Sequence, residues 1–551
     1  MGDGHQYCSA REKVAMAPYD LTLTVNSDGS PVYKSSKFNI WPVQVIVNEL
    51  PPRLRWSNVM TPLLWYGQQH PHMPMLLQAF VQQLEKLNAS GITWTLSGTQ
   101  VCSKMHLPEL RCSRWYNSMG TSAVAGATIQ GPMLKLTGTI KYCMDQPYPD
   151  RTDEQTLADM SAACRTGTIV HGVKGPSPLI NLPGFSPAWS WCPDYMHCVL
   201  LGVSRQLTEL WFSDTGTEYY CGMPSTMRLI NERLCKIRMP VCVSRQPRSL
   251  QVRKYWKASE WQYWLLHYSV PCLTDVLGEK YLTHWSLLVS GVFLLLKDSI
   301  SNADVDLSTQ LLTEFVVGVE FLYGRKNMTY NVHQVLHLPK SALLFGPLWA
   351  HSCFTFETNM GRLLQLITSA NGVALQVATR LLLRSSLLVM KARASSHVLS
   401  LIQESSAKEC LDSITPLGKP EVVRDVSAHT QLQEKEVVEF RRVKVRGAVI
   451  ASERYSKHVR SNSTAVVLPD GTYARAKRIF CSRESSGEEH FYIITEAYSV
   501  DSILPSGHIK TARKQGHECL FMIDTQTQPC IYFCFNNREY FCDFVNSYEW
   551  F

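Results

Sequence analysis

The stretch Leu21-Thr-Leu-Thr-Val25, continued by Asn26-Ser-Asp28-Gly-Ser-Pro-Val-Tyr-Lys-Ser-Ser36, decides the expected fold. Apolar and polar residues alternate in its first half, which predicts a β-strand. Asp28 follows that strand at once. An aspartate at the end of a strand can hold Mg²⁺ in a fixed geometry, as metal-dependent phosphoryl-transfer enzymes require. The simpler interpretation is that Asp28 and Gly29 only form a turn.

The residues that follow predict a sheet with a helix beside it. The runs Val43 to Asn48 and Asn58 to Tyr66 predict two further strands, and Pro51-Pro52 ends the first of them because proline lacks an N–H donor. Met75 to Leu87 carries apolar residues at helical spacing. This strand, strand, strand, helix order suits the beginning of an RNase H-like α/β core.

The remainder of the chain predicts a large helical region and a C-terminal β domain. Residues 106 to 170 have little periodicity, so we expect a loop-rich insertion there. We expect helices at Asp153 to Cys164, Met196 to Trp211, Pro224 to Arg238, Ala258 to Tyr268, Thr283 to Lys297, Leu307 to Tyr323 and Ala374 to Ala394. After residue 435 the apolar runs are short, among them Val437 to Val449 and Cys519 to Asp524. Asp470-Gly471 between two of these runs is a hairpin signal. This pattern predicts a small antiparallel β-barrel.

The expected domain boundaries follow from these changes in pattern. Residues 1–19 predict a disordered lead and residues 20–300 a catalytic-type core. Residues 301–404 predict a helical domain, and residues 405–434 have the Ser, Glu, Lys and Pro composition of a linker. Residues 435–551 predict a C-terminal β domain that folds independently and makes few contacts with the helical body.

Composition favours a globular protein without a membrane span. A hydrophobic fraction of 45% is enough for large cores. No segment has eighteen consecutive apolar residues, and the N-terminus lacks a charged-then-apolar signal. None of the 18 cysteines forms a C-x-x-C pair, so we expect thiols rather than a disulfide framework.

An ordered series of short motifs covers roughly residues 20 to 370. After the opening stretch come Gly172-Val-Lys-Gly-Pro-Ser-Pro178, Leu182-Pro-Gly-Phe185, Pro193-Asp-Tyr-Met-His197, Cys198-Val-Leu-Leu-Gly-Val203, Pro247-Arg-Ser-Leu250, Trp256-Lys-Ala-Ser-Glu-Trp261, Tyr330-Asn-Val-His333, Leu336-His-Leu338, Phe345-Gly-Pro347 and Phe354-Thr-Phe-Glu357. In this order they resemble the transposase domain of CACTA-type (En/Spm-like) DNA transposons, in the form found in animal genomes. The resemblance implies an RNase H-like core with three acidic residues, Mg²⁺ or Mn²⁺ as cofactor, DNA as partner and a nuclear location.

The resemblance makes Asp28 the first acidic residue of this core. The second normally lies in an Asp-Ser-x-Ala-Arg-like segment near Val101 to Cys112, where the chain offers only Glu109. For the third, Glu260 begins a predicted helix, and Asp194 is the other candidate, although it fits a helix N-cap equally well. The catalytic candidates are therefore Asp28, Glu260 and Asp194, with Asp28 and Glu260 as metal ligands. Because the second acid is missing, we expect impaired catalysis.

A zinc site is not expected. The family often carries a C-x-x-C segment after the second acid, whereas this chain has Cys112 alone. Cys102, His106, Cys112 and Cys143 could supply four ligands, but their spacing is not diagnostic. A deletion or mis-spliced segment would explain the loss of both the acid and the cysteine pair.

His333 and His337 lie four residues apart, as in the zinc-binding half of an H-E-x-x-H motif. Position 334 is Gln, so the general base of a metalloprotease is absent. The preferred interpretation is a pair of structural histidines, and the alternative is a part in the nucleic-acid machinery that the resemblance implies.

Two basic runs are candidates for contact with DNA phosphates. The first supplies the predicted DNA-binding residues Arg233, Lys236, Arg238, Arg245, Arg248, Arg253, Lys254 and Lys257. Three tryptophans beside this run, Trp256, Trp261 and Trp264, favour core packing over stacking on bases. The second run, between Arg441 and Arg460, fits either a solvated edge strand or a contact with phosphate or an acidic protein tail.

The leading hypothesis is therefore a transposon-derived DNA-binding protein whose strand-cleavage chemistry is impaired. The alternative is a non-catalytic module, derived from a transposase, that binds chromatin or another protein. The sequence leaves the oligomeric state open.

Overall fold

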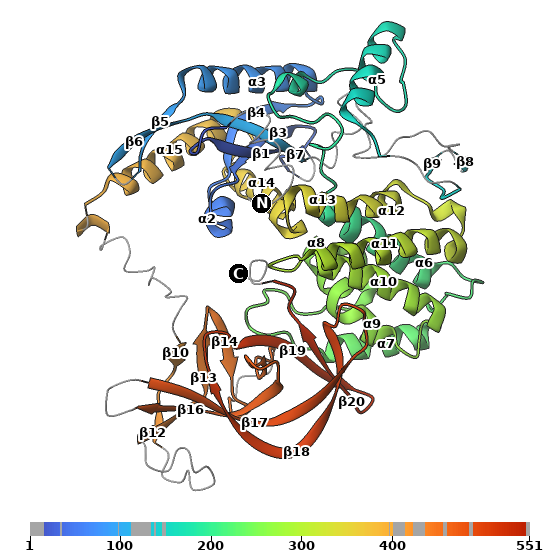
Figure 1. The fold of residues 1–551 in the computed structure, drawn as a ribbon, viewed down its shortest axis with the longest axis vertical. Helices are drawn as coiled ribbons and strands as arrows, with labels where there is room; N and C mark the ends of the chain where they lie inside the picture. Colours follow the sequence, from blue (N-terminus) through green and yellow to red (C-terminus); the bar gives the residue numbers. More distant parts are fainter. Residues whose placement is uncertain are drawn as a thin grey trace. The chain divides into compact units, whose positions relative to one another are not determined.

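The computed structural model describes residues 16–33, 36–96, 98–111, 134–136, 139–145, 150–395, 397–399, 414–422, 436–455, 460–483 and 489–546. The chain divides into two compact units (Figure 1). Unit 1 comprises Met1–Arg205 and Ser299–Ile402, and unit 2 comprises Gln206–Asp298 and Gln403–Phe551.

A five-stranded sheet forms the centre of unit 1. Its strands are β1 (Leu21–Ser27), β2 (Ser30–Pro31), β3 (Asn39–Val47), β4 (Met60–Gly67) and β7 (Met105–Arg111). Strand β3 pairs antiparallel with β1, β2 and β4, while β7 pairs parallel with β1 on its other side. In this register Val25 lies opposite Val45, and Asn26 lies opposite Arg111. The three strands expected from the alternating sequence are confirmed.

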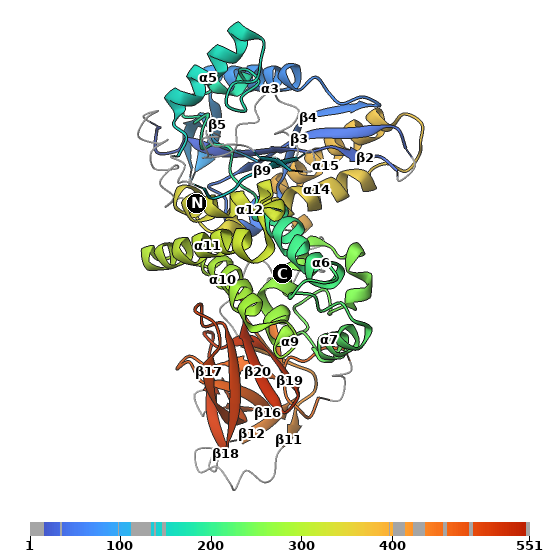
Figure 2. The ribbon, with the colours of Figure 1, turned by 90° about the vertical axis from the view of Figure 1, so that its right-hand side faces the viewer.

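Helices cover both faces of this sheet (Figures 1 and 2). On one face, Leu77 and Phe80 of α3 (Met73–Ser90) pack in one core with Val25 and Val43. On the other face, α14 (Phe354–Gln365) and α15 (Val373–Arg393) pack against Val32 and Ile40. A buried hydrogen bond of 2.8 Å from Asn359 Nδ2 to Gln44 Oε1 fixes α14 to β3. Helix α15, more than three hundred residues after β3 in the sequence, thus packs on the sheet that contains β3.

Shorter elements complete unit 1. Two small hairpins are formed by β5 (Ile92–Leu96) with β6 (Thr99–Ser103), and by β8 (Leu134–Leu136) with β9 (Thr139–Lys141). The other helical elements are α2 (Pro52–Ser57), α5 (Asp153–Thr166), the π-helix η2 (Met196–Ser204), α11 (Asn302–Tyr323), α12 (Tyr330–Gln334) and α13 (Leu338–Phe345).

Unit 2 combines helices with a closed β-barrel. The helices are α6 (Arg205–Ser213), α7 (Pro224–Lys236), α8 (Ala258–Tyr263), the π-helix η4 (Trp264–Tyr268), α9 (Ser269–Leu273) and α10 (Glu279–Leu295). Trp256, Trp261 and Trp264 are buried and contact one another through their rings, so their predicted role in core packing is confirmed.

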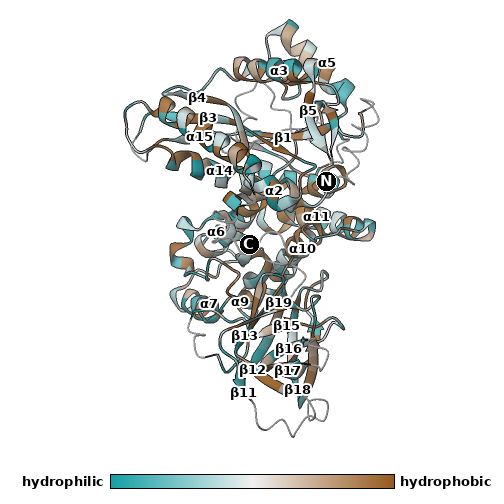
Figure 3. Cartoon of the chain, turned by 90° about the vertical axis from the view of Figure 1, so that its left-hand side faces the viewer, coloured by the Kyte–Doolittle hydropathy of each residue, from teal (hydrophilic) through white to brown (hydrophobic). Residues whose placement is uncertain are grey.

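Six antiparallel strands close the barrel in the order β16, β15, β19, β20, β18, β17 and back to β16. They are β15 (Ala465–Val467), β16 (Tyr473–Arg483), β17 (Glu489–Ser502), β18 (Ile509–Ile523), β19 (Gln528–Phe535) and β20 (Arg538–Asp543). Hydrophobic and hydrophilic residues are mixed along these strands (Figure 3), as expected when one side of each strand faces the barrel core. The predicted barrel and the hairpin at Asp470-Gly471 are confirmed.

The compact units do not follow the boundaries expected from the sequence. Residues 206–298 belong with the barrel rather than with the core that begins at residue 20, and residues 301–404 belong with that core. Part of the predicted linker forms strands β10 (Ile414–Leu417) and β11 (Glu421–Val422), which pair with β13 (Arg442–Val445) and β12 (Glu436–Phe440). Strand β14 (Ala448–Ala451) pairs with β13. The predicted lead and the rest of the linker lie mostly outside the described residues.

Helix α15 carries an exposed apolar surface. Leu375, Leu382, Leu383 and Met390 are all largely exposed. The window Val373–Lys391 is long and apolar enough to span a membrane by length and composition alone, and only 11% of it is buried. One such helix is weak support for a span, and the expected lack of a membrane partner stays a prediction.

Candidate metal and catalytic site

Three side chains from distant parts of unit 1 converge beside the end of β1. Asp28 follows β1, His197 lies on η2, and Glu357 lies in the first turn of α14. One ligand atom from each lies within 4.8 Å of the other two. The His197 side chain is 27% exposed and that of Glu357 is 48% exposed, so the group opens to solvent. The site can therefore be reached by a ligand from outside the protein.

The chain at Asp28 leaves no room for a side chain on the next residue. A Cβ atom added to Gly29 would lie 2.1 Å from the Trp41 ring, far inside van der Waals contact. The Gly29 N–H donates to Asp28 Oδ1 at 2.7 Å. Asp28 and Gly29 do not form the expected turn, because Ser27 pairs with Val43 and Ser30 pairs with Ile40 in one continuous register along β3. They form a short interruption between β1 and β2 that packs closely against β3 and places the Asp28 carboxylate at the end of β1.

Asp194 connects η2 to α14. Its Oδ2 atom accepts hydrogen bonds from the His197 N–H at 3.1 Å and from His197 Nδ1 at 2.6 Å. Its Oδ1 atom accepts from the backbone N–H of Cys353, the residue before α14, at 3.0 Å. One buried carboxylate therefore positions both the imidazole of His197 and the helix start that carries Glu357. The N-cap interpretation of Asp194 agrees with the hydrogen bond to the His197 N–H.

Charge within the group alters two pKa values. Burial alone would raise the pKa of Asp194, but its hydrogen bond and ion pair with His197 and the two backbone N–H donors lower it. Burial alone would lower the pKa of His197, but Asp194, with the negative charges of Glu357 and Asp28, raises it. The imidazole thus lies in a strongly negative environment, which is also the environment that a divalent cation needs.

The donor set fits one divalent cation. Adjacent ligand atoms on an octahedral Mg²⁺ lie about 3 Å apart and opposite ones about 4 Å apart. The His197 Nε2 to Glu357 Oε1 distance is 3.9 Å, close to that range. Asp28 and Glu357 supply hard oxygen atoms, and His197 supplies a nitrogen atom. Among the described residues of unit 1, this is the one solvent-open group of possible ligands. Its two carboxylates are enough for one cation, whereas two cations would require at least a third carboxylate.

Glu260 is not in the unit that contains Asp28. Its carboxylate accepts from the Lys257 N–H at 2.8 Å and forms a two-point ion pair with Arg248, whose second contact is 2.8 Å long. Glu260 is therefore placed as a buried helix-capping residue of unit 2. Within unit 1, the helical glutamate beside Asp28 is Glu357.

The position expected for the second acid is described only in part. Glu109 lies on β7, where its Cα pairs with Thr24. Its side chain and the residues from Cys112 to 133 lie outside the described part of the chain.

His197 and Glu357 were missed as site residues. Both belong to motifs quoted above for the family resemblance, Pro193-Asp-Tyr-Met-His197 and Phe354-Thr-Phe-Glu357. A glutamate in the first turn of an amphipathic helix could have been ranked beside Glu260. No pattern in the sequence shows that this helix packs next to the end of β1.

The alternative zinc ligands do not assemble among the described residues. His106 forms an ion pair with Asp20 at 3.1 Å, Cys102 is exposed and Cys143 is buried. Cys112 lies outside the described residues. The clusters of possible metal ligands found in the described chain contain none of these residues.

His333 and His337 have the environment of structural histidines. Both are buried, their Nε2 atoms lie 3.3 Å apart, and Tyr142 stacks on His333. Burial lowers the pKa of His333 to about 3 and that of His337 to about 4. Neutral imidazoles in this core are consistent with the structural interpretation.

The first basic run divides into exposed and internally bound residues. Arg233 is buried and donates to the carbonyl oxygens of Cys272 and Thr274, while Arg253 pairs with Glu209 at 2.8 Å. Arg248 pairs with Glu260. The remaining predicted DNA-binding residues are exposed, namely Lys236, Arg238, Arg245, Lys254 and Lys257. Of these, Arg245 lies 4.0 Å from the Glu260 carboxylate and Arg238 donates to the carbonyl oxygen of Cys235. The expected phosphate contact, which no observation tests, thus depends on these five.

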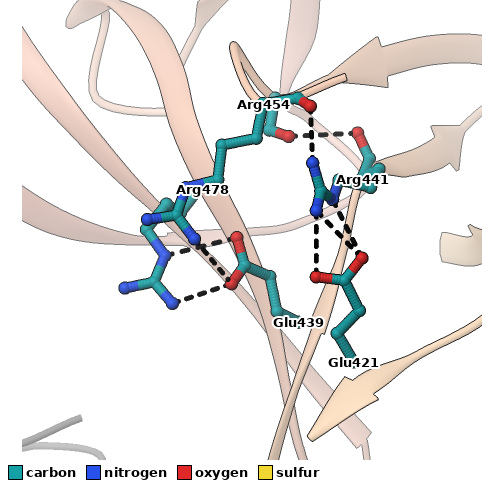
Figure 4. Close-up of polar contacts among 6 residues, drawn as sticks. Glu421, Glu439, Arg441, Arg454 and Arg478 are labelled. Atoms are coloured by element: carbon teal, nitrogen blue, oxygen red, sulfur yellow. Dashed lines mark hydrogen bonds and ion pairs between the residues drawn. The ribbon is translucent and has the colours of Figure 1, made fainter. Parts of the chain in front are cut away.

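The second basic run is partly neutralised within its own sheet (Figure 4). Arg478 and Arg454 converge on the buried carboxylate of Glu439 at 2.7 and 3.3 Å. Arg441 forms a two-point ion pair with Glu421 and donates to the carbonyl oxygen of Arg454. The strand that carries Arg442 and Lys444, β13, lies between β10 and β14, so the expected edge strand is wrong. The contact with phosphate or an acidic protein tail stays a prediction.

Comparison of the sequence with protein-family models and with curated proteins found no match.

Proposed function

We propose that the protein is a DNA-binding derivative of a CACTA-type transposase, and that the group at the end of β1 is the remnant of its metal-dependent strand-cleavage site. The observation that carries the proposal is the convergence of Asp28 and Glu357, more than three hundred residues apart in sequence, at one solvent-open point of unit 1. The resemblance places the first acid at Asp28 and includes the motif that ends in Glu357.

The architecture of unit 1 supports an RNase H-like assignment. Such a core is a central sheet flanked by helices, with acidic residues at a strand end and on a helix. In unit 1, α3 and the pair α14 and α15 cover opposite faces of the sheet. Asp28 ends a central strand of that sheet, and Glu357 begins the helix that packs on it.

The chemistry of this site follows from its donors. A bound divalent cation would activate an attacking oxygen atom or stabilise a leaving oxygen atom at a phosphodiester. Asp28 and Glu357 would hold the cation, and the exposed side of Glu357 leaves space for a phosphate group. Asp194 keeps the imidazole of His197 and the start of α14 in place, because each of its two oxygen atoms accepts a hydrogen bond from one of these elements.

The test is nicking of a supercoiled plasmid by the full chain in the presence of Mn²⁺. We expect weak nicking that is lost in both Asp28→Asn and Glu357→Gln. Glu314→Gln, an exposed glutamate on helix α11 of the same unit, is the matched control and should behave as the wild type. Nicking that persists in Asp28→Asn and Glu357→Gln would exclude this site as its source.

One observation favours the second candidate, a non-catalytic module that binds chromatin or another protein. The stretch that normally supplies the second acid, near Val101 to Cys112, contains no aspartate, and its one glutamate is Glu109. If the wild type and all the variants bind DNA and none of them nicks it, this candidate is favoured.

A further inference from the structure

We propose that His197 is itself a metal ligand through Nε2, and that Asp28, His197 and Glu357 form a site for a single divalent cation that prefers Mn²⁺ over Mg²⁺. In this site Asp194 is the positioning residue that aims the imidazole ring. The inference rests on the proposed metal-dependent function and gives it a ligand set that an all-carboxylate site would not have.

The orientation of the imidazole ring follows from its partner. A carboxylate can only accept hydrogen bonds, so the 2.6 Å contact to Asp194 Oδ2 requires that His197 Nδ1 carries the proton. In the neutral ring Nε2 then has the lone pair. Nε2 lies 3.9 Å from Glu357 Oε1, and a carboxylate oxygen of Asp28 lies within 4.8 Å of a ring nitrogen of His197. An outer carboxylate that orients an inner histidine is a common arrangement at metal centres.

Asp194 fixes the other ligands as well. Its second oxygen atom holds the Cys353 N–H at the start of α14, four residues before Glu357. The local helix around His197 is also constrained, because a Cβ atom at Gly202 would lie 2.6 Å from Asn331 Nδ2 and 2.9 Å from the His197 carbonyl oxygen. His197 and Glu357 therefore come from packed helices, and Asp28 lies next to Gly29, which packs closely against Trp41. This packing favours a site with fixed geometry.

The ligand types decide the expected cation. Mg²⁺ prefers oxygen ligands, whereas an imidazole nitrogen favours later divalent metals. Two carboxylates and one imidazole suit Mn²⁺, which accepts both. We expect Mn²⁺ to bind roughly tenfold or more tightly than Mg²⁺.

A second group shares His197. One ligand atom each from Asp194, His197 and Cys353 also lie within 4.8 Å of one another. A cation there would have to displace the hydrogen bonds that His197 and Cys353 donate to Asp194. We therefore place the cation on the open side of the ring, and the experiment separates the two sites.

The experiment is Mn²⁺ binding to the full chain, followed by electron paramagnetic resonance. The wild type should bind one Mn²⁺ with electron spin echo modulation from a directly bonded ¹⁴N atom. His197→Gln should abolish the modulation and weaken binding, and Asp194→Asn should weaken binding roughly 10- to 100-fold. His517→Gln, at an exposed histidine of the barrel, and Cys353→Ser should leave both properties unchanged.

Four results would overturn the inference. They are wild-type protein that binds no Mn²⁺, bound Mn²⁺ without nitrogen modulation, modulation that survives in His197→Gln, and binding that falls in Cys353→Ser. Labelling the wild type with ¹⁵N-histidine should replace the ¹⁴N modulation by that of ¹⁵N, which tests the nitrogen ligand without any substitution. This measurement decides the question if the His197→Gln protein does not fold. Mn²⁺ that is coupled to nitrogen, in a protein that does not nick plasmid, would refute the proposed catalysis and support the metal site. Plasmid nicking by a protein whose Mn²⁺ shows no nitrogen coupling would support catalysis and refute His197 as a ligand.

Discussion

At the scale of single residues, two glutamates of neighbouring strands show how burial decides the worth of an ion pair. Glu421 and Glu439 lie opposite each other in the pairing of β11 with β12, and both bind arginines (Figure 4). Glu439 is 3% exposed and Glu421 is 52% exposed. The carboxylate of Glu439 has left water, so its arginine partners are the groups that compensate its burial.

We expect Glu439→Gln to lower the free energy of unfolding of unit 2 by roughly 1–3 kcal/mol, because a buried acceptor for charged donors is lost. The matched change Glu421→Gln should cost roughly 0–1 kcal/mol, since solvent screens an exposed pair. Denaturant unfolding followed by circular dichroism measures both values. Equal losses in the two variants would show that burial is not the deciding factor.

The residues of the candidate site show what a sequence can and cannot predict at this scale. Asp28 could be placed at a strand end because the alternation of Leu21 to Val25 is a local pattern. The helix that carries Glu357, α14, is not among the helices expected from the sequence. That this helix packs beside β1 depends on side-chain fit across more than three hundred residues, for which one sequence contains no periodic signal. Glu260, which begins a predicted helix, is a buried capping residue instead.

At the scale of elements, α14 and α15 are consecutive helices with different surroundings. Leu363 of α14 is 1% exposed in the core that joins the helices to β3, whereas Leu383 of α15 is 64% exposed. We expect Leu363→Ala to destabilise unit 1 by roughly 2–5 kcal/mol through lost burial and a residual cavity. Leu383→Ala should change stability by no more than roughly 0.5 kcal/mol.

Thermal or denaturant unfolding of the two leucine variants provides the measurement. Since α14 carries Glu357, Leu363→Ala should also weaken Mn²⁺ binding, while Leu383→Ala should not. A large loss of stability in Leu383→Ala would mean that the exposed face of α15 is covered by another molecule in solution.

Elements were predictable where one face of the element is buried and the other is wet. The apolar period of α3 and α11 arises in this way. Strand β1 alternates apolar and polar side chains although both of its faces are buried. Residues 288–295 of α10 are all buried, whereas only 11% of the apolar window of α15 is buried. The first half of β18 was missed because residues 513–518 are exposed, so no apolar residue alternates there. The single run expected from Val437 to Val449 forms three strands, which are separated at Arg441 and at Arg446–Gly447. Neither break was recognised in the apolar pattern of the sequence.

At the scale of the whole molecule, unit 2 is assembled from two separate parts of the chain. Several hydrogen bonds join the C-terminal β region to the helical segment 206–298. Asn462 N–H donates to Met239 O at 3.0 Å, Asn546 Nδ2 donates to Leu296 O at 3.1 Å, and His508 Nε2 lies 2.8 Å from Leu266 O. The expectation that few contacts tie the barrel to the helical body is therefore wrong for residues 206–298.

Two buried histidines at this junction make unit 2 sensitive to acid. Burial lowers the pKa of His267 to about 3 and holds that of His508 well below its ordinary value. Each is neutral when folded, so below an unfolded pKa of about 6.5 the unfolded state binds more protons. Stability should be constant above about pH 6.5 and fall below it, by roughly 1.4 kcal/mol per pH unit for each histidine until its folded pKa is reached.

His267→Phe should reduce this slope, because the ring remains apolar at every pH and its neighbours include Phe544. The measurement is denaturant unfolding at several pH values from about 7.5 to about 4.5. The exposed His517→Phe is the control and should keep the wild-type slope. An unchanged slope in His267→Phe would assign the acid sensitivity to other groups.

The last prediction concerns the independence of the barrel. If residues 436–551 formed a separate domain, cutting the chain between residues 423 and 435 would release a folded fragment. Strands β10 and β11 precede the cut and pair with β13 and β12 after it, and residues 206–298 belong to the same unit as the barrel. A specific protease site inserted there should therefore yield two pieces that elute together under native conditions and separate only in denaturant. The uncut insertion variant, with wild-type melting behaviour, is the control. A C-terminal piece that elutes alone and melts cooperatively would mean that the barrel folds without residues 206–298.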